Sequence, residues 1–140
     1  MFINPKTNPV DRTALSVAFT VGLYGAAFGA AGVTAGFSIL QTCLLSLLLF
    51  SGASQFAVVG IMGAGGAAIS AIATATLLGF RNALYGIQMA PILKVKGLKR
   101  ILSAQITIDE STAVSTLQEN DSDRRRGFYI TGIGVYVFWN

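Results

Sequence analysis

Two places in this sequence put charged side chains among apolar residues. Arg81 is the first charged residue after the 68 neutral residues Thr13 to Phe80, and Asp109 and Glu110 lie together in the stretch QITIDEST. A charge in apolar surroundings is costly unless it has a partner. We therefore expect an ion pair between Arg81 and one of the two acids, with Asp109 favoured. The alternatives are an arginine that reaches a membrane interface and two acids on a solvated cytoplasmic helix.

A second group of polar residues lies inside the neutral run itself, in the stretch FSGASQF. Gly52, Ser54 and Gln55 belong to it. Glycine tolerates unusual backbone angles and serine competes for backbone hydrogen bonds, so a helix is expected to break here. Amides at the start of a half helix can bind a carboxylate, and unwound carbonyls can bind an ammonium, which suits an amino acid. The alternative is that these small polar residues only pack helices together.

Arg81 also belongs to a wider polar pattern. Ser70, Thr74, Arg81, Tyr85 and Gln88 follow one another at intervals of 4, 7, 4 and 3 residues. These intervals place them on one face of a helix, and we expect that face to point into the protein.

The composition favours a membrane protein without an enzyme centre. Hydrophobic residues make up 53% and charged residues 11% of the chain, against about 25% charged residues in soluble domains. There is no histidine and there is one cysteine, so we expect no metal site, no cofactor and no enzymatic activity. A hydrolase using Ser54 and Asp109 would lack a base.

The charge distribution argues for a membrane orientation signal and against nucleic-acid binding. The net charge is +4, and the basic stretch KVKGLKR, 94–100, directly follows an apolar segment. This placement is typical of a cytoplasmic loop, whereas nucleic-acid binding needs more basic and aromatic residues.

The elements that must position these residues are membrane helices. The apolar segments predict an all-α, polytopic integral membrane protein with one transmembrane domain over 1–140. Expected spans are 13–33, 37–62, 66–93, 101–118 and 127–140. The second is expected to be broken or re-entrant, and the fourth to be a span or a re-entrant helix. The fifth is too short for a bilayer core of about 30 Å, so the domain is expected to be incomplete.

Glycines mark the first span. Gly22, Gly25, Gly29, Gly32 and Gly36 are separated by 3, 4, 3 and 4 residues and share one helix face. Such a stripe lets another helix approach closely in a membrane.

Four motifs in a fixed order carry a family resemblance. GLYGAAFGAAG, FSGASQF, LLGFRNALYG and LSAQITIDEST resemble the AzlC-like family, the large subunits of bacterial branched-chain amino acid exporters. The resemblance implies a multi-pass protein of the bacterial plasma membrane that exports branched-chain amino acids, with proton coupling and a small hydrophobic partner subunit. The signature positions correspond here to Gly52, Ser54, Gln55, Arg81, Tyr85, Asp109 and Glu110.

One departure from the family and two open points accompany this resemblance. Where the family commonly has a histidine, this chain has Asn82, so a proton role for that histidine does not carry over. If the fold consists of inverted repeats, the chain is expected to hold one repeat and the start of the next. The alternative function is a truncated membrane scaffold that transports nothing by itself.

Overall fold

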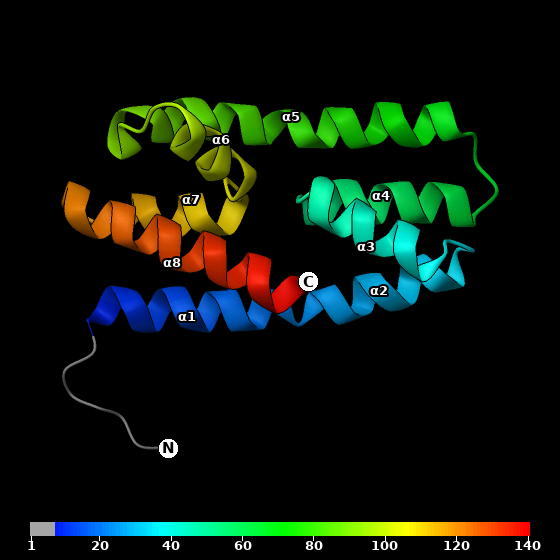
Figure 1. Ribbon diagram of the computed structural model, residues 1–140, viewed down its shortest axis with the longest axis horizontal. Coiled ribbons are helices and arrows are strands. Elements are labelled where there is room, and N and C mark those ends of the chain that lie inside the picture. The colour runs from blue at the N-terminus through cyan, green and yellow to red at the C-terminus, as the bar shows by residue number, and fades with distance from the viewer. Residues whose placement is uncertain (1–7) are drawn as a thin grey trace, which may run out of the picture.

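The computed structural model describes residues 8–140, and this part of the chain forms eight α-helices and no β-strand (Figure 1). The predicted all-α class is therefore confirmed. The helices are α1 (Pro9–Gly22), α2 (Tyr24–Thr34), α3 (Ile39–Leu48), α4 (Gly52–Gly63), α5 (Ala68–Leu93), α6 (Leu98–Gln105), α7 (Asp109–Thr116) and α8 (Asp121–Trp139).

Two long helical segments run in opposite directions along the molecule. Only Leu23 separates α1 from α2, and it keeps right-handed helical angles, so Pro9–Thr34 acts as one helix of 26 residues. Among the described residues, this is the one helix that by length and composition could cross a membrane. α5 also has 26 residues, and both segments are about 39 Å long at 1.5 Å per residue. Figure 1 shows α5 returning from the end that α2 reaches.

The apolar segment expected as the second span is divided into a helical hairpin. α3 begins with a capping box, in which the Ser38 hydroxyl accepts from the Gln41 amide and the Gln41 side chain accepts from the Ser38 amide. The chain then turns at 49–51, which overlaps the start of the stretch FSGASQF, 50–56, where a break was predicted. Gly63, at the end of α4, lies against Ala35, which precedes α3. α3 and α4, called the first hairpin below, therefore return to the end from which they start (Figure 1).

A second hairpin follows α5 at the opposite end of the molecule. α6 and α7 contain 8 residues each and are joined by a turn at 106–108. α8 then begins beside the end of α5, where the Arg125 side chain donates to the Ile92 carbonyl over 2.7 Å. α6 and α7, the second hairpin, also return to their starting end, and the tips of the two hairpins meet near the middle of the molecule (Figure 1).

The long helices and the hairpins pack through small residues. α1 packs along α8, α4 along α5 and α7 along α8. Ala14 and Ala18 of α1 are 0% exposed. A Cβ atom on Gly22 would clash with Phe138, and one on Gly25 would clash with the backbone of Trp139.

Of the predicted glycine stripe, Gly22 and Gly25 contact α8. Gly32 instead lies against Thr42 of α3, nothing lies within 4 Å of a Cβ on Gly29, and Gly36, with a φ of 90°, lies beyond the helix.

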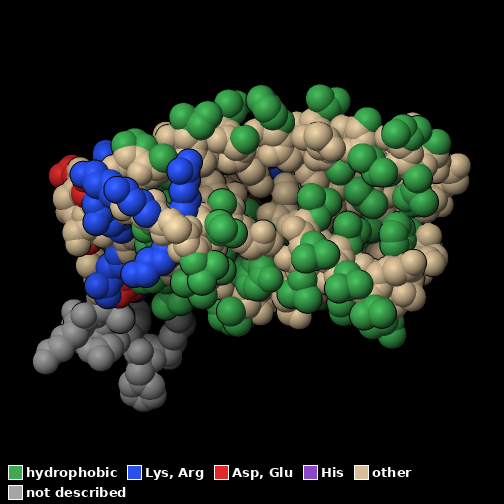
Figure 2. Space-filling model, turned by 45° about the horizontal axis from the view of Figure 1, so that its top comes forward, with side chains coloured by type: hydrophobic (Ala, Val, Ile, Leu, Met, Phe, Trp, Pro, Cys, Tyr) green, Lys and Arg blue, Asp and Glu red, His purple; other side chains and the backbone are tan. Residues whose placement is uncertain are grey.

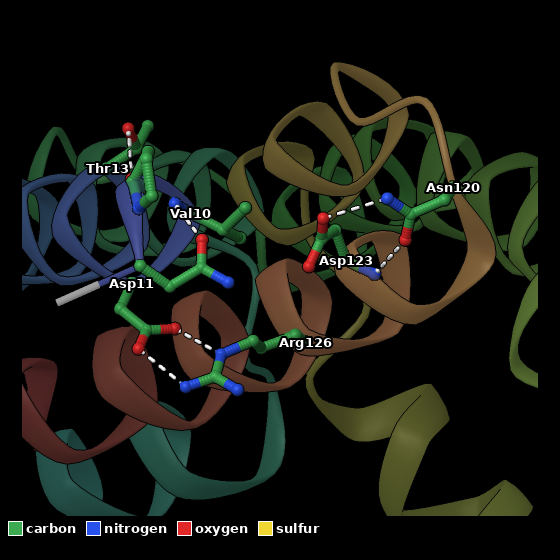
Figure 3. Close-up of polar contacts among 8 residues, drawn as sticks. Val10, Asp11, Thr13, Asn120, Asp123 and Arg126 are labelled. Atoms are coloured by element: carbon green, nitrogen blue, oxygen red, sulfur yellow. Dashed lines mark hydrogen bonds and ion pairs between the residues drawn. The ribbon is translucent and has the colours of Figure 1, made fainter. Parts of the chain in front are cut away.

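Charged side chains gather at one end of the molecule (Figure 2). At this end Asn8 caps α1 by accepting from the Val10 amide, and Asn120 caps α8 by accepting from the Asp123 amide (Figure 3). Arg126 of α8 donates two hydrogen bonds to Asp11 of α1, one of them over 2.6 Å (Figure 3). This ion pair lowers the pKa of Asp11 and raises that of Arg126.

Candidate binding site between the hairpin tips

A small cavity of about 70 Å³ lies where the two hairpin tips meet. By the same measure, one water needs about 10–15 Å³, so the cavity is large enough for the polar head of a small solute. Its polar and small lining residues are Ser51, Gly52, Ala53, Arg81, Asn82, Asp109 and Glu110; its apolar lining residues are Val21, Phe50, Ile108, Val135 and Trp139.

An ion pair lines this cavity. Arg81 Nη1 of α5 lies 2.9 Å from Asp109 Oδ2, and both side chains are 39% exposed. The predicted pairing of Arg81 with Asp109 is thereby confirmed. Because Arg81 lies close to the middle of α5 and Asp109 is the first residue of α7, the pair joins a long helix to the tip of the second hairpin.

The tip of the first hairpin presents free backbone amides. Ser51 is extended, with φ −152° and ψ 102°, and its side chain does not cap α4. The first hydrogen bond of α4 runs from the Gln55 amide to the Ser51 carbonyl. Among the described residues, no acceptor meets the amides of Gly52, Ala53 and Ser54. These amides and the positive end of the helix dipole favour an anion.

Several buried polar atoms around the cavity have no partner within residues 8–140. They include Ser51 Oγ, Asn82 Oδ1, Arg81 Nε and Trp139 Nε1. Ser51 is 6% exposed and Trp139 is 9% exposed. An unpaired buried polar group costs about 1–3 kcal/mol.

The tip of the second hairpin presents carboxylates where the first presents bare amides. Asp109 and Glu110 are the first two residues of α7, next to its positive dipole end. Ser111, which is 0% exposed, shapes the preceding turn by accepting from the Ile108 amide and donating to the Ile106 carbonyl. In the described part of the chain, the Glu110 carboxylate forms no hydrogen bond or ion pair with another side chain.

Three of the predicted site residues lie outside the cavity. Ser54 and Gln55 are both 0% exposed and hold the first hairpin in place. Ser54 Oγ donates to the Ala75 carbonyl of α5 over 2.9 Å, and Gln55 Nε2 donates to the Ser46 carbonyl of α3 over 3.1 Å. Tyr85, half-buried one turn beyond Arg81, does not line the cavity.

The polar stripe on α5 also differs from the expected interior face. Ser70 and Gln88 are exposed, while Thr74, Arg81 and Tyr85 are half-buried. Only Arg81 of this stripe lines the cavity.

The structure adds lining residues that the sequence pattern did not single out. Asn82 follows Arg81 directly, and this adjacency is the one sequence feature that could have indicated that Asn82 lines the cavity. Trp139, whose position resembles an interfacial aromatic, instead packs inside, with its ring stacked 6.2 Å from that of Phe28. No local pattern could place Trp139 there, because its position depends on α8 approaching Gly25.

Comparison with known proteins places these motifs in one family. The family model described as AzlC protein matches residues 16–140. An uncharacterized membrane protein of Archaeoglobus fulgidus is 33% identical over 131 residues, which cover 94% of this chain and 53% of the relative. An uncharacterized membrane protein of Haemophilus influenzae is 25% identical over 146 residues, covering 97% of this chain and 60% of the relative.

A third relative has a name of its own. The inner membrane protein YgaZ of Escherichia coli is 29% identical over 123 residues, covering 84% of this chain and 46% of the relative. The chain therefore spans about half the length of the curated relatives that it matches. No solved structure matches it.

Proposed function

Because this chain belongs to the AzlC protein family, we propose that it forms part of a polytopic membrane transporter that exports branched-chain or similar apolar amino acids. The observation that carries the proposal is the cavity between the hairpin tips. It holds free helix amides on one side and carboxylates on the other, and it lies beside Arg81, close to the middle of a 26-residue helix. Transporters commonly bind substrates at such broken helices near the bilayer midplane.

The helix lengths support a re-entrant role for both hairpins. α3 and α4 have 10 and 12 residues, and α6 and α7 have 8 each. At 1.5 Å per residue these helices are about 12–18 Å long, roughly half of a 30 Å bilayer core. In the proposed arrangement the long helices cross the membrane and the hairpins enter it from opposite sides. Their irregular tips are acceptable at that depth because they line a protein cavity.

The proposed transporter lies in the plasma membrane, binds a small hydrophobic partner subunit and couples export to protons. Relatives from two bacteria and one archaeon are named as membrane proteins, which supports a plasma-membrane location. Large apolar side chains are exposed along α3 and α5, including Leu40, Leu44, Leu77 and Ile87. These faces suit lipid or a small hydrophobic partner subunit. Protons are the proposed coupling ion, with Asp109 and Glu110 as the acids nearest the cavity.

The test is an export assay with the natural full-length protein and its partner subunit. Cells are loaded with a leucine-containing dipeptide, and leucine appearing in the medium is measured. We expect expression to accelerate export, Arg81→Gln to remove most of that gain, and Arg100→Gln, on the exposed surface of α6, to retain it. Equal export with and without the protein would contradict the proposal.

The same assay separates the transporter from the scaffold alternative. A scaffold would stabilise its partner subunit in the membrane whether or not Arg81 is intact. Partner levels that depend on the protein, combined with leucine export that does not, would favour the scaffold.

A further inference from the structure

Two segments of the described chain, 9–63 and 68–116, called the two halves below, repeat one pattern, and their equivalent helices begin 57 or 59 residues apart. Each half contains a long helical segment followed by a hairpin, and the two halves run in opposite directions (Figure 1). Identical residues recur in the two halves at a spacing of 57 residues. They are Ala14 and Ala71, Ala18 and Ala75, Gly22 and Gly79, Ala26 and Ala83, Gly29 and Gly86, Leu45 and Leu102, Ser46 and Ser103, and Ser54 and Ser111.

Buried serines support the equivalence of the two hairpins. Ser46 and Ser103, in the first helix of each hairpin, are 5% and 4% exposed, and Ser54 and Ser111, in the second helix of each, are both 0% exposed. Two units of this length fit in 9–116.

The two hairpin tips differ at the two cavity-lining positions that begin the second helix of each hairpin. At the spacing of 57, Gly52 corresponds to Asp109 and Ala53 to Glu110. Gly52 and Ala53 are the first two residues of α4, and Asp109 and Glu110 are the first two residues of α7. In α7 the acidic side chains supply negative charge to the helix start. In α4 nothing does, so its amides remain available to an anion from outside the described chain.

We propose that the two tips divide the recognition of one zwitterion, with the carboxylate held by the first hairpin at Ser51, Gly52 and Ala53, and the ammonium held by Glu110. This assignment rests on the proposed amino-acid transport. Ser51 supplies the second observation besides the helix start: it lines the cavity, it is 6% exposed, and its hydroxyl has no partner in the described chain. Glu110 is assigned to the ammonium because Asp109 is already paired with Arg81.

Trp139 provides a direct readout of this site. It lines the cavity and is the one tryptophan among the 140 residues. Its fluorescence in the purified full-length protein can be titrated with three ligands of the same apolar shape: leucine, 4-methylpentanoate, which lacks the ammonium, and 3-methylbutylamine, which lacks the carboxylate. Trp139→Phe identifies the signal that comes from this residue.

The two tips should respond to different ligands. We expect Glu110→Gln to weaken leucine and 3-methylbutylamine binding by about tenfold, the loss of one charge-assisted contact, without changing 4-methylpentanoate binding. Ser51→Ala should weaken leucine and 4-methylpentanoate severalfold without changing 3-methylbutylamine. Glu119→Gln, on an exposed position beyond α7, is the matched control and should change none of them.

Several outcomes would overturn the assignment. These are equal effects of either variant on all three ligands, no effect of Glu110→Gln on leucine, or no response of Trp139 to leucine. If Glu110→Gln does not fold, Glu110→Asp keeps the charge and should weaken only the two ammonium ligands. If the variants change ligand binding as expected but the protein exports no leucine, the proposed transport is refuted and the assignment of the two tips stands. If the protein exports leucine but the variants affect all three ligands equally, the assignment is refuted and the proposed transport stands.

Discussion

Arg81 and Asp109 lie 2.9 Å apart and connect the middle of α5 to the first residue of α7. This contact holds the tip of the second hairpin against a long helix on one side of the cavity. Because both side chains are 39% exposed, the pair is neither a solvated surface pair nor a fully buried one.

Removing one member of this pair should destabilise the protein. We expect Arg81→Gln or Asp109→Asn to lower the free energy of unfolding by about 1–3 kcal/mol, between the values for exposed and buried pairs. The double variant Arg81→Asp with Asp109→Arg should recover part of the loss, as measured by thermal unfolding in detergent. A double variant no better than either single exchange would show that the pair contributes no specific stability.

The close contact between α1, α2 and α8 predicts different effects for similar glycines. Gly25→Ala should lower the free energy of unfolding by about 1–3 kcal/mol, because its Cβ would clash with the Trp139 backbone. Gly29→Ala is the matched control. Nothing lies within 4 Å of its Cβ, and alanine is favoured over glycine in helices by about 0.8–1.0 kcal/mol. Thermal unfolding of both variants tests the seam, and equal destabilisation would argue against it.

The hairpins predict which segments share a side of the membrane. In a Cys43→Ser background, cysteines at Thr34 and Ala64 should react with an impermeant maleimide from one side, and cysteines at Lys96 and Glu119 from the other. All four positions are exposed. If α3 and α4 instead formed one continuous span, Thr34 and Ala64 would react from opposite sides.

The contact between Asp11 and Arg126 predicts a pH dependence at the charged end. Arg126 lowers the pKa of Asp11 from its ordinary value of 3.8. The stabilisation is therefore fully present above about pH 4 and is lost as the pH falls through the lowered pKa of the folded state. Asp11→Asn should reduce the acid sensitivity of unfolding, measured by fluorescence between pH 5 and pH 2, conditions chosen to bracket the ordinary carboxylate pKa.

A control separates this contact from general acid effects. Glu119→Gln removes an exposed carboxylate that has no side-chain partner among the described residues. It should leave the acid profile unchanged. Identical profiles for Asp11→Asn and the unchanged protein would contradict the assignment.

The sequence was sufficient for the helical class and for the central ion pair, because few charges interrupt the apolar segments and each needs a partner. The sequence did not predict which side chains of α4 face the cavity and which face α3 and α5. The break lies at 49–51, at the start of the predicted stretch 50–56, and each residue of shift turns a helix face by about 100°. Ser54 and Gln55 consequently point toward α5 and α3, and Ser51 lines the cavity.

The position of Trp139 shows a second limit of local patterns. Its ring lines the cavity because α8 returns to meet α2 and the tip of the first hairpin. Contacts between residues so far apart along the chain leave no periodic signal in either segment. They become visible only when the helices are placed together.

The uneven distribution of charge has a consequence for how the protein enters a bilayer. The turns that join α2 to α3 and α4 to α5, 35–38 and 64–67, contain no charged residue. Carrying this end through the hydrocarbon layer therefore requires no ion to lose its hydration. The opposite end holds the basic residues of 94–100 and 124–126, and these can stay in water throughout biosynthesis. One end is thus suited to translocation and the other to retention at the side of synthesis.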